Sequence, residues 1–520
     1  MHQTDVAIIG AGLAGILAAA AASEAGASVL LVDRGAVGLG TNSAMSNGYF
    51  CGPTESYPPG KYVSDTLDIG RGINRLSYVQ RVADQAGAAI AHLGELGVEL
   101  SPGPAGYQSP TPRQDVIRGA GLMSALAASL RERPGVSTLT GLQVRRLLLA
   151  NGRVAGLEGL DKQGQTQRVA AGTVILACGG AGAVYAVNDN MKAIMGQGYT
   201  LAAQAGLPLM DLEFVQFYPL VLVEPGLPPV MLYPAYPGEV RLINSAGEDI
   251  LAPHGLSDVT KAIMGLRDKL SQIMAEEARR GPVRLDYTGV PEELWDRYPM
   301  ALLSHMNFDF KRRPVSVMPG AHFCMGGVAV DGQGRTGLEG LFACGEMVWG
   351  LHGANRRGGN ALTECLVSGR LAGRGAAQEA RAQGRAALQP AGPAPARPPA
   401  GGGALRRLRD RLRQIAWERA GVARAERDMA LGQSELAQWQ RELGRVGADS
   451  PRQEWLRWDL ECGGRFVAGV LAASLARRES RGALLRRDFP EQDDATWRVN
   501  SCLTLDPDGA WRVDHQPVEG

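Results

Sequence analysis

The sequence predicts an α/β protein: a Rossmann-like domain, a smaller α+β domain inserted into it, and a C-terminal helical domain. Three observations predict this fold. The chain opens with an apolar segment, a glycine-rich turn and a run of small residues, as in a βαβ unit. Two later apolar segments also end in glycines, at 173–182 and 340–345. A stretch of Pro, Ala and Gly then precedes a region rich in tryptophan.

The first 33 residues carry a dinucleotide-binding motif. An apolar strand at 5–9 leads into a turn containing Gly10, Gly12 and Gly15, and Asp33 ends the next strand. Gly10 allows the tight turn, Gly12 lets the backbone approach a pyrophosphate, and Gly15 lets helix and strand pack closely. The helix N-terminus offers N–H groups to phosphates, and Asp33 would accept from a ribose hydroxyl. An ordinary packed βαβ unit is the alternative interpretation.

Two later segments favour FAD over NAD as the dinucleotide. The apolar strand at 173–178 runs into Gly179 and Gly180, and the strand at 341–344 runs into Gly345-Glu346. Both are typical of strands that return to the first sheet with their ends at the cofactor. One such strand alone would more often be plain core, but together with the opening motif they predict an FAD-binding domain.

The chain divides into five segments. The Rossmann-like FAD-binding domain is predicted at 1–206 and 321–385, with an α+β capping domain inserted at 207–320. Residues 386–404 are rich in Pro, Ala and Gly, which predicts a flexible linker without a core of its own. Residues 405–520 form a predicted helical domain with a terminal hairpin. Six of the eight tryptophans lie there, which indicates a separate packed core.

Composition disfavours several kinds of partner. The net charge of +1 gives no electrostatic basis for binding nucleic acid or an anionic membrane. None of the seven cysteines forms a C-x-x-C pair, which argues against an iron–sulfur cluster or metal site in this chain. Their irregular spacing fits a reducing, cytoplasmic compartment. The uncharged run at 6–23 contains several glycines and lacks a preceding basic segment, so we interpret it as buried strand and helix.

Six stretches in a fixed order link the chain to a known family. They are the opening glycine turn, ACGG at 177–180, MDLEFVQF at 210–217, HFCMGG at 322–327, GLHGANRRGGN at 350–360 and RESRG at 478–482. They resemble the flavoprotein subunits of succinate dehydrogenase and fumarate reductase, a group that includes L-aspartate oxidase. The resemblance implies an FAD-dependent oxidoreductase that transfers a hydride between flavin N5 and a CH–CH or C=C bond next to a carboxylate or carbonyl. The implied substrate is a small organic acid or its derivative.

The resemblance also implies catalytic and cofactor residues. Arg356 is the candidate clamp for a substrate carboxylate, because its planar fork matches that group. His322 is the second candidate, and Tyr218 belongs to the same pocket. The family's proton-donating Arg matches Arg267, 14 residues before Gly281, better than the segment at 257–259. The expected cofactor contacts are Gly10, Gly12, Gly15, Asp33, Arg34, Asn42, Ser43, Gly179, Gly180, Glu346, Asn360, Ala361 and Leu362.

Departures from the family pattern concern the substrate. Tyr218-Pro219 stands where the family usually has His-Pro, and YPAYP at 233–237 replaces its Thr-Glu-x-x-Arg segment. One carboxylate clamp and the usual proton relay are therefore in doubt. Plain fumarate, succinate and L-aspartate are disfavoured as substrates. Tyr218, Tyr233 and Tyr236 point instead to a bulkier, less charged or aromatic substrate. Gly196-Gln197-Gly198 replaces the family's Gly-Asp-Gly, a change without an evident reason in the sequence.

Electrons also need a route to or from the flavin. Since the chain has no cluster motif, a separate iron–sulfur or haem protein, a soluble carrier or oxygen must exchange them. We expect an oxidoreductase in a cytoplasmic complex, without direct membrane insertion and associated with a membrane only through a partner. An electron-transfer subunit is one alternative, and an oxygen-using amine or amino-acid oxidase is another.

We predict that FAD is bound non-covalently. In the family's membrane complexes FAD is attached to a His near the first glycine-rich loop, but the corresponding stretch here, TNSAM at 41–45, contains no His. Acid precipitation should therefore release the yellow colour into the supernatant. Colour that stays with the precipitated protein would contradict the prediction.

Overall fold

The computed structural model describes residues 2–110, 113–233, 236–385, 388 and 403–519. The predicted linker at 386–404 lies almost entirely outside these residues.

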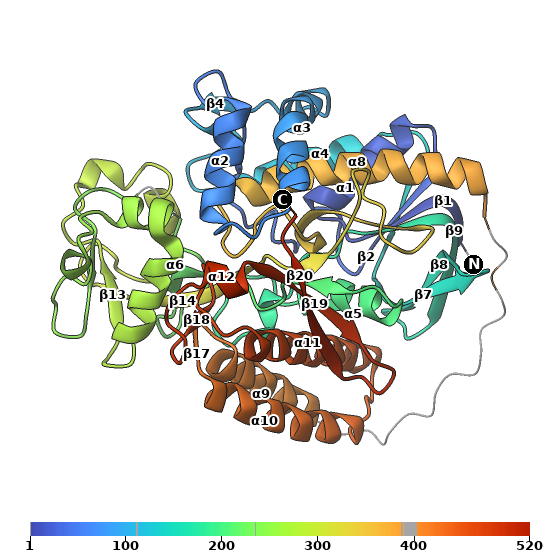
Figure 1. Ribbon diagram of the computed structural model, residues 1–520. Coiled ribbons are helices and arrows are strands. Elements are labelled where there is room, and N and C mark those ends of the chain that lie inside the picture. The colour runs from blue at the N-terminus through green and yellow to red at the C-terminus, as the bar shows by residue number, and fades with distance from the viewer. Residues whose placement is uncertain (1, 111–112, 234–235, 386–387, 389–402, 520) are drawn as a thin grey trace.

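A seven-stranded sheet forms the centre of the fold (Figure 1). Its order is β6-β2-β1-β9-β8-β7, and β16 pairs with β9. The pairs β1–β2, β1–β9, β2–β6 and β9–β16 are parallel, so the predicted return of both glycine-ended strands to the opening sheet is confirmed. The strands are β1 (His2–Ile9), β2 (Val29–Asp33), β6 (Val136–Thr140), β7 (Leu142–Ala150), β8 (Arg153–Asp161), β9 (Thr166–Leu176) and β16 (Leu341–Ala343).

Two helices of small residues lie side by side across this sheet (Figure 1). They are α1 (Leu13–Glu24), directly after β1, and α8 (Asn360–Gln383). A Cβ atom at Gly369 would lie 2.5 Å from the Ala14 carbonyl oxygen, and one at Gly373 would lie 2.2 Å from that of Ala18. Glycine at these two positions therefore permits the close contact between α8 and α1, and this contact positions α8.

A second layer of short elements completes the first part of the chain. Helices α2 (Pro59–Ile69), α3 (Leu76–Glu95) and α4 (Arg118–Arg131) accompany a small antiparallel sheet of order β3-β5-β4. Its strands are β3 (Tyr49–Cys51), β4 (Ser101–Gly103) and β5 (Gly106–Gln108). Helix α3 packs against both α2 and α8, which links this layer to the central sheet.

An antiparallel sheet with its own core projects to one side of the molecule (Figure 1, left). Its order is β11-β14-β13-β12, and helix α6 packs on β11 and β14. We call these elements, with helix α7, the cap unit. Its elements are β11 (Val215–Leu222), β12 (Arg241–Ile243), α6 (Val259–Glu277), β13 (Val283–Asp286), α7 (Met300–Leu303) and β14 (Val315–Cys324).

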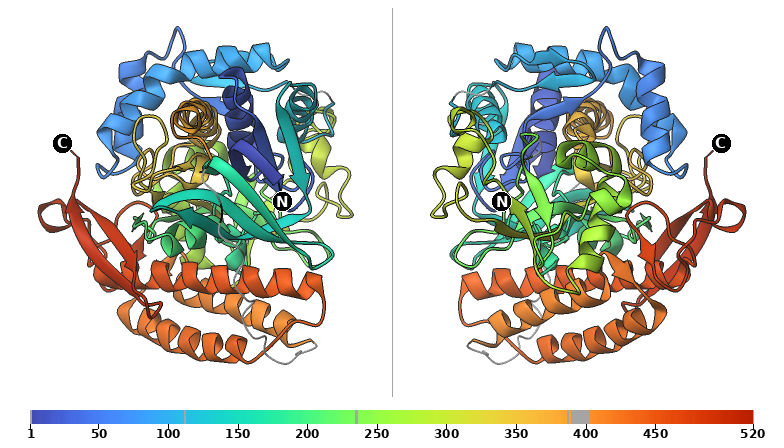
Figure 2. Two further views of the ribbon diagram at one scale, coloured as in Figure 1. Left: turned by 90° about the vertical axis from the view of Figure 1, so that its right-hand side faces the viewer. Right: turned by 90° about the vertical axis from the view of Figure 1, so that its left-hand side faces the viewer.

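Three long helices lie together below the central sheet in both views of Figure 2. They are α9 (Ala404–Arg419), α10 (Glu426–Gly444) and α11 (Pro451–Ala476). Helix α11 contacts β8 and helix α5 (Gln197–Gln204). The terminal strands β19 (Val499–Leu505) and β20 (Trp511–Pro517) form a hairpin, and β19 also pairs with β10 (Leu209–Met210), which pairs with β15 (Gly327–Val328). The short elements β17 (Ala423–Arg424), β18 (Leu485–Arg486) and α12 (Asp494–Trp497) complete this region.

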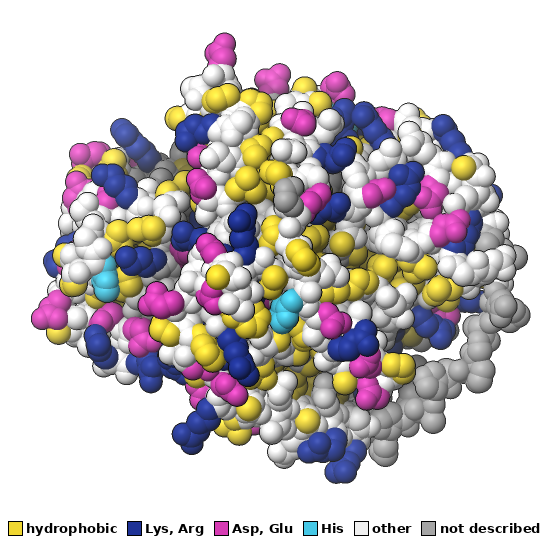
Figure 3. Space-filling model, viewed as in Figure 1, with side chains coloured by type: hydrophobic (Ala, Val, Ile, Leu, Met, Phe, Trp, Pro, Cys, Tyr) yellow, Lys and Arg dark blue, Asp and Glu magenta, His cyan; other side chains and the backbone are white. Residues whose placement is uncertain are grey.

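The surface carries charges of both signs. Figure 3 shows Lys and Arg intermixed with Asp and Glu over one face. Within the described part of the chain, no helix combines the length and the apolar character needed to cross a membrane.

A buried ion network connects two of the sequence stretches that carried the family resemblance. Arg477 donates through Nε to Glu213 Oε1 at 2.8 Å and through Nη1 to Glu479 Oε1 at 2.9 Å. Arg481 donates to the same Glu479 oxygen at 2.6 Å. All four side chains have 0% exposure. The network therefore fastens the segment after α11 to the segment that leads into the cap unit.

Removing one member of this network should destabilise the protein strongly. Glu213→Ala leaves a buried guanidinium without one of its carboxylates, which typically costs about 3–5 kcal/mol. We expect a clearly lower melting temperature by calorimetry. Asp514→Ala is the control, because its pair with Arg512 is 63% exposed on both sides and exposed pairs contribute about 0–1 kcal/mol. Equal melting temperatures for the two variants would contradict this assignment.

Candidate active site

The opening glycine turn is tight at two positions and open at the third. A Cβ at Gly10, whose φ is +109°, would lie 2.3 Å from the Ala177 carbonyl oxygen, and one at Gly15 would lie 1.9 Å from that of Gly10. At Gly12 the nearest atom is Ser43 Oγ at 3.6 Å. Gly12, the N-cap residue of α1, has no side chain to cap the helix; Ser43 Oγ accepts from the Leu13 amide, and the other first-turn amides are available to an anion. These features fit the pyrophosphate of a dinucleotide.

Asp33 fastens the end of β2 to the turn. Its Oδ2 accepts a hydrogen bond from the Ala11 amide at 2.8 Å, and its Oδ1 accepts from the Gly35 amide at 2.6 Å. Burial raises the pKa of Asp33, although both amides oppose the shift. The carboxylate therefore stabilises the backbone of the turn.

Arg34, a predicted cofactor contact, points instead to helix α11. It donates to both carboxylate oxygens of Asp459, at 2.8 and 3.0 Å, and lies over the Trp455 ring. Gln197 donates to Asp459 Oδ1 at 2.7 Å and to the Ala193 carbonyl at 2.8 Å. The glutamine of Gly196-Gln197-Gly198 thus helps to hold α11 against the central domain, which gives that departure from the family pattern a structural reason.

The other predicted cofactor residues gather around the ends of β9 and β16. Asn42 donates to Asn190 Oδ1 at 2.7 Å, and Ser43 Oγ accepts from the Leu13 amide at 3.2 Å. Gly179 has a φ of +73°, and a Cβ at Gly180 would lie 2.1 Å from Glu346 Oε1. That oxygen accepts from the Cys324 amide at 3.1 Å, and burial raises the pKa of Glu346 to about 7.

Asn360 begins helix α8 and is fully buried. Its Nδ2 donates to Thr66 Oγ1 at 3.4 Å, while its Oδ1 has no hydrogen-bond partner among the described residues. The next two residues, Ala361 and Leu362, line a cavity. An unpaired buried acceptor costs free energy unless a group occupies the space beside it. The open turn at Gly12 fits the pyrophosphate of an FAD, whereas Asn360 itself does not line the cavity.

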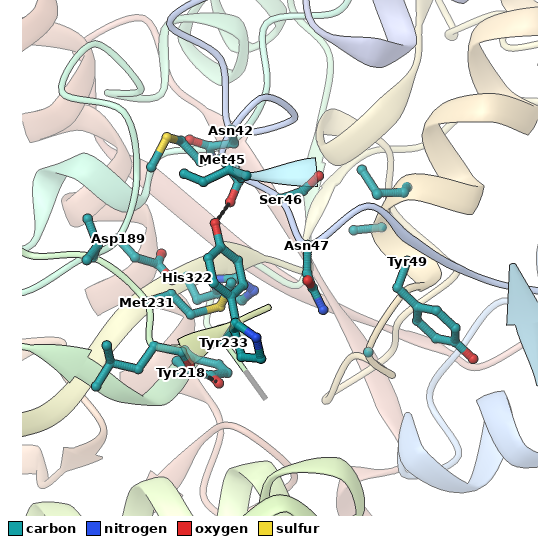
Figure 4. A pocket seen from close by; sticks show the side chains of 18 of the residues that line it. Asn42, Met45, Ser46, Asn47, Tyr49, Asp189, Tyr218, Met231, Tyr233 and His322 are labelled. Atoms are coloured by element: carbon teal, nitrogen blue, oxygen red, sulfur yellow. Dashed lines mark hydrogen bonds and ion pairs between the residues drawn. The ribbon is translucent and has the colours of Figure 1, made fainter. Parts of the chain in front are cut away.

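A cavity of about 520 Å³ lies between these residues and the cap unit. All four predicted catalytic residues line it: Tyr218, Arg267, His322 and Arg356. Five of the predicted cofactor contacts line it too: Asn42, Ser43, Glu346, Ala361 and Leu362. Figure 4 shows part of this lining, including Tyr218 and His322. The structure therefore brings all four predicted catalytic residues and five of the thirteen predicted cofactor contacts to one cavity.

Two arginines are buried in this cavity. Arg356 is 6% and Arg267 is 8% exposed. Gln216 Oε1 accepts from Arg356 Nε at 3.0 Å and from Arg267 Nη1 at 3.4 Å. Burial, and then the charge of Arg267, lower the pKa of Arg356 to about 9, and burial also lowers the pKa of Arg267. Helix α6 is interrupted at Leu266 (φ −136°, ψ 40°), immediately before Arg267.

His322 forms a close pair with Asp189, a residue that the sequence analysis did not select. His322 Nδ1 lies 2.7 Å from Asp189 Oδ2, and the side chains are 20% and 6% exposed. Since a carboxylate only accepts, Nδ1 carries the proton. Burial lowers the pKa of His322; the charge and hydrogen bond of Asp189 oppose this shift, and the charges of Arg356 and Arg267 add to it. The imidazole is therefore neutral at neutral pH, which leaves Nε2 as a hydrogen-bond acceptor.

The three tyrosines expected in the pocket are bound to backbone carbonyls. Tyr218 donates to the Leu232 carbonyl at 2.7 Å, and Tyr236 donates to the same oxygen. Tyr233 donates to the Met45 carbonyl at 2.7 Å (Figure 4). Tyr218 and Tyr233 line the cavity but Tyr236 does not. Residues 234 and 235, in the middle of the YPAYP segment, lie outside the described residues. The Tyr218 ring contributes its face to the site, with the Arg267 guanidinium 5.4 Å from its centroid.

Sequence reasoning missed two residues of the site. Gln216 lies within the MDLEFVQF stretch, so its position in that motif was a usable signal. Asp189 offered none, because it reaches His322 through a backbone bridge between Asn188 and Ala321 that only the fold creates. Among the residues that the structure describes, no three His, Cys, Asp or Glu side chains come together as a metal ion would need.

A glycine turn at a helix N-terminus, joined to a cavity with two buried arginines, fits a nucleotide-dependent enzyme. The comparisons make this specific. Residues 5–362 match the family model of an FAD binding domain, and residues 409–520 match the fumarate reductase flavoprotein C-terminal model.

Relatives extend over nearly the whole chain. An L-aspartate oxidase of Agrobacterium fabrum is 33% identical, covering 96% of this chain and 94% of the relative. One subunit of the fumarate reductase (CoM/CoB) of Methanothermobacter marburgensis is 30% identical, covering 94% and 95%. The structure of E. coli quinol fumarate reductase matches with a TM-score of 0.88 at 27% identity, covering 100% of this chain and 98% of that one. The chain belongs to the succinate dehydrogenase/fumarate reductase flavoprotein family and is an FAD-dependent oxidoreductase.

The glycine turn yields a prediction that separates folding from cofactor binding. The Cβ of Gly12→Val would meet no atom closer than 3.6 Å, but the side chain blocks the approach of the pyrophosphate, so the variant should fold and contain little FAD. Gly15→Ala places a Cβ 1.9 Å from a carbonyl oxygen, so it should lose stability as well. Flavin absorbance per protein and circular dichroism measure the two effects.

Gly87→Ala is the control, because a Cβ on that residue of α3 meets no atom within 4 Å. A folded Gly12→Val protein with a full complement of FAD would refute the assignment.

Proposed function

We propose that this protein transfers a hydride between FAD and a carbon–carbon bond next to the carboxylate of an organic acid other than fumarate or succinate. One observation carries the proposal: Arg267 and Arg356 lie buried in one cavity with the predicted flavin contacts. Bound FAD supplies hydride exchange at N5. Gly10, Gly12, Gly15, Gly179, Gly180, Glu346 and the start of α8 would hold it.

Arg356 is proposed as the substrate clamp. Its Nε is occupied by Gln216, and its terminal nitrogens make no hydrogen bond with any described residue. They are therefore available to a carboxylate, which a guanidinium binds in a bidentate manner. Its Cζ atom lies 4.7 Å from the centroid of the Phe323 ring, which packs against the guanidinium group.

Arg267 is proposed to exchange the proton at the neighbouring substrate carbon. Its Nε is buried without a partner, and burial lowers its pKa, which makes loss of a proton less costly than for an exposed arginine. The neutral His322 lies beside it and is proposed to orient the substrate through Nε2. Tyr218 is proposed to position Arg267 through its ring.

The electron partner is proposed to be a separate carrier protein, for example an iron–sulfur protein. Any association with a membrane would occur through that partner. An oxygen-using oxidase is the second candidate, because relatives at 29–33% identity are L-aspartate oxidases. Rapid reoxidation of the reduced flavin by air, without a carrier, would favour the oxidase.

Anaerobic reoxidation tests the proposed reaction. The protein is reduced with dithionite and mixed with a panel of unsaturated acids while flavin absorbance is followed. We expect at least one acid to restore the oxidised spectrum. If neither unsaturated acids nor, in the reverse direction, their saturated forms change the flavin, the proposal fails.

Arg356→Lys should lose turnover while keeping FAD. A lost charge-assisted bond beside the reacting carbon costs about 10²–10³ in rate, and a lysine cannot reproduce the fork. Rate per bound FAD and melting temperature are measured together. Arg357→Lys is the matched control. Arg357 is the next residue in the chain, but its side chain binds Tyr57 and Asp65 and does not line the cavity. An Arg356→Lys protein with wild-type turnover and reduced stability would show that Arg356 only supports the fold.

A further inference from the structure

The charges that line the cavity nearly balance. Four of its side chains are ionisable acids or arginines: Arg267 and Arg356 carry positive charge, and Asp189 and Glu346 are acids. Burial raises the pKa of Glu346 to about 7, so it is partly protonated near neutral pH. With His322 neutral, at most one positive charge stays uncompensated. A buried site gains most from an anion that cancels its charge and loses when a second one is added.

Asp189 supplies one of the negative charges in this balance. It also determines which imidazole nitrogen of His322 carries the proton. In the neutral imidazole, Asp189 Oδ2 holds the single proton on His322 Nδ1 at 2.7 Å, so Nε2 carries the lone pair. A lone pair repels a carboxylate oxygen. The His322 side chain itself therefore offers neither a positive charge nor a donor to a second carboxylate.

The cap unit gives the cavity an apolar wall. Arg267 is the one charged side chain that this unit contributes to the described lining. The rest is mainly methionine, leucine and tyrosine: Tyr218, Val230, Met231, Leu232, Tyr233, Met264, Tyr287, Pro299, Met300, Leu302, Leu303, Met306 and Phe323, with Thr260 and His322 as the polar exceptions. Methionine-rich walls adapt to apolar groups of varied shape, and apolar area removed from water favours binding.

We infer that Asp189 determines substrate specificity: by neutralising one positive charge and holding His322 as an acceptor, it selects a monocarboxylic acid whose apolar body lies against the methionine-rich wall of the cap unit. The inference rests on the proposed function, since it assigns the class of acid that the Arg356 clamp holds. Dicarboxylates would place their second anionic group beside Asp189.

Binding to the oxidised holoprotein tests the inference without turnover. Crotonate and fumarate form a matched pair, because a methyl group in one replaces a carboxylate in the other. Each is titrated while the change in the flavin absorbance spectrum is recorded, and cinnamate and L-aspartate are titrated in the same way. We expect crotonate to bind more tightly than fumarate, cinnamate to bind more tightly than crotonate, and L-aspartate to bind more weakly than either monocarboxylate. The wild-type comparison needs no variant.

Asp189→Asn should reverse the preference. The substitution removes one negative charge from the cavity, so fumarate should bind about tenfold more tightly or better. The affinity for crotonate should change by less than about threefold, because the methyl group that replaces the second carboxylate carries no charge. Asp488→Asn is the control. Asp488 also loses one charge from an ion pair, with the buried Arg486, and does not line the cavity. It should leave the crotonate-to-fumarate ratio nearly unchanged. FAD content and melting temperature show that both variants fold.

The inference is overturned if wild-type protein binds fumarate or L-aspartate as tightly as crotonate and cinnamate, or if a folded Asp189→Asn protein keeps the wild-type ratio. These outcomes are distinct from failure of the proposed function. Acids that bind with the expected preference but never exchange electrons with the flavin would refute the reaction and leave the binding specificity in place. Reoxidation by fumarate as the preferred acid would refute the specificity and leave the reaction class in place.

Discussion

The side-chain amide of Gln216 holds the active-site cavity together. Its oxygen accepts from Arg356, on the loop before α8, and from Arg267, on helix α6 of the cap unit. Its nitrogen donates at 2.9 Å to both Asn355 Oδ1 and the Arg356 carbonyl. One neutral amide thus orients two guanidinium groups that would otherwise repel each other. A carboxylate at this position would hold them more strongly, but it would also cancel the charge that an anionic substrate needs.

The rest of the fold supports this arrangement from a distance. β11 carries Gln216, and Glu213, three residues earlier, is bound by the buried Arg477 after helix α11. The segment from Glu213 to Gln216 is therefore fixed at one end by the C-terminal region and at the other by the arginines of the cavity. The MDLEFVQF stretch therefore has two roles. Glu213 binds Arg477 in the core, and Gln216 binds the two arginines of the cavity.

Local sequence patterns were sufficient for much of the fold. Two local signals predicted the central sheet: the apolar strands, and the glycines that follow β1 and β9. Both signals depend only on residues that are close together in the sequence. The arginines of the cavity also came from a local motif. Contacts between distant segments could not be obtained in this way. Arg34 and Asp459 are 425 residues apart, and Asp189 and His322 are 133 apart. Each pair depends on how separate elements pack, which no spacing in the sequence encodes.

The same electrostatics would favour one anion in the cavity and limit its capacity for a second. Burying two guanidinium groups removes their hydration, which lowers the pKa of both Arg267 and Arg356. An anion placed between them restores part of the lost stabilisation, so the ligand-bound form is favoured by mass action. Asp189 already supplies one negative charge at the edge of the site. The first carboxylate therefore relieves repulsion between cations, whereas a second would have to overcome its own desolvation and the charge of Asp189.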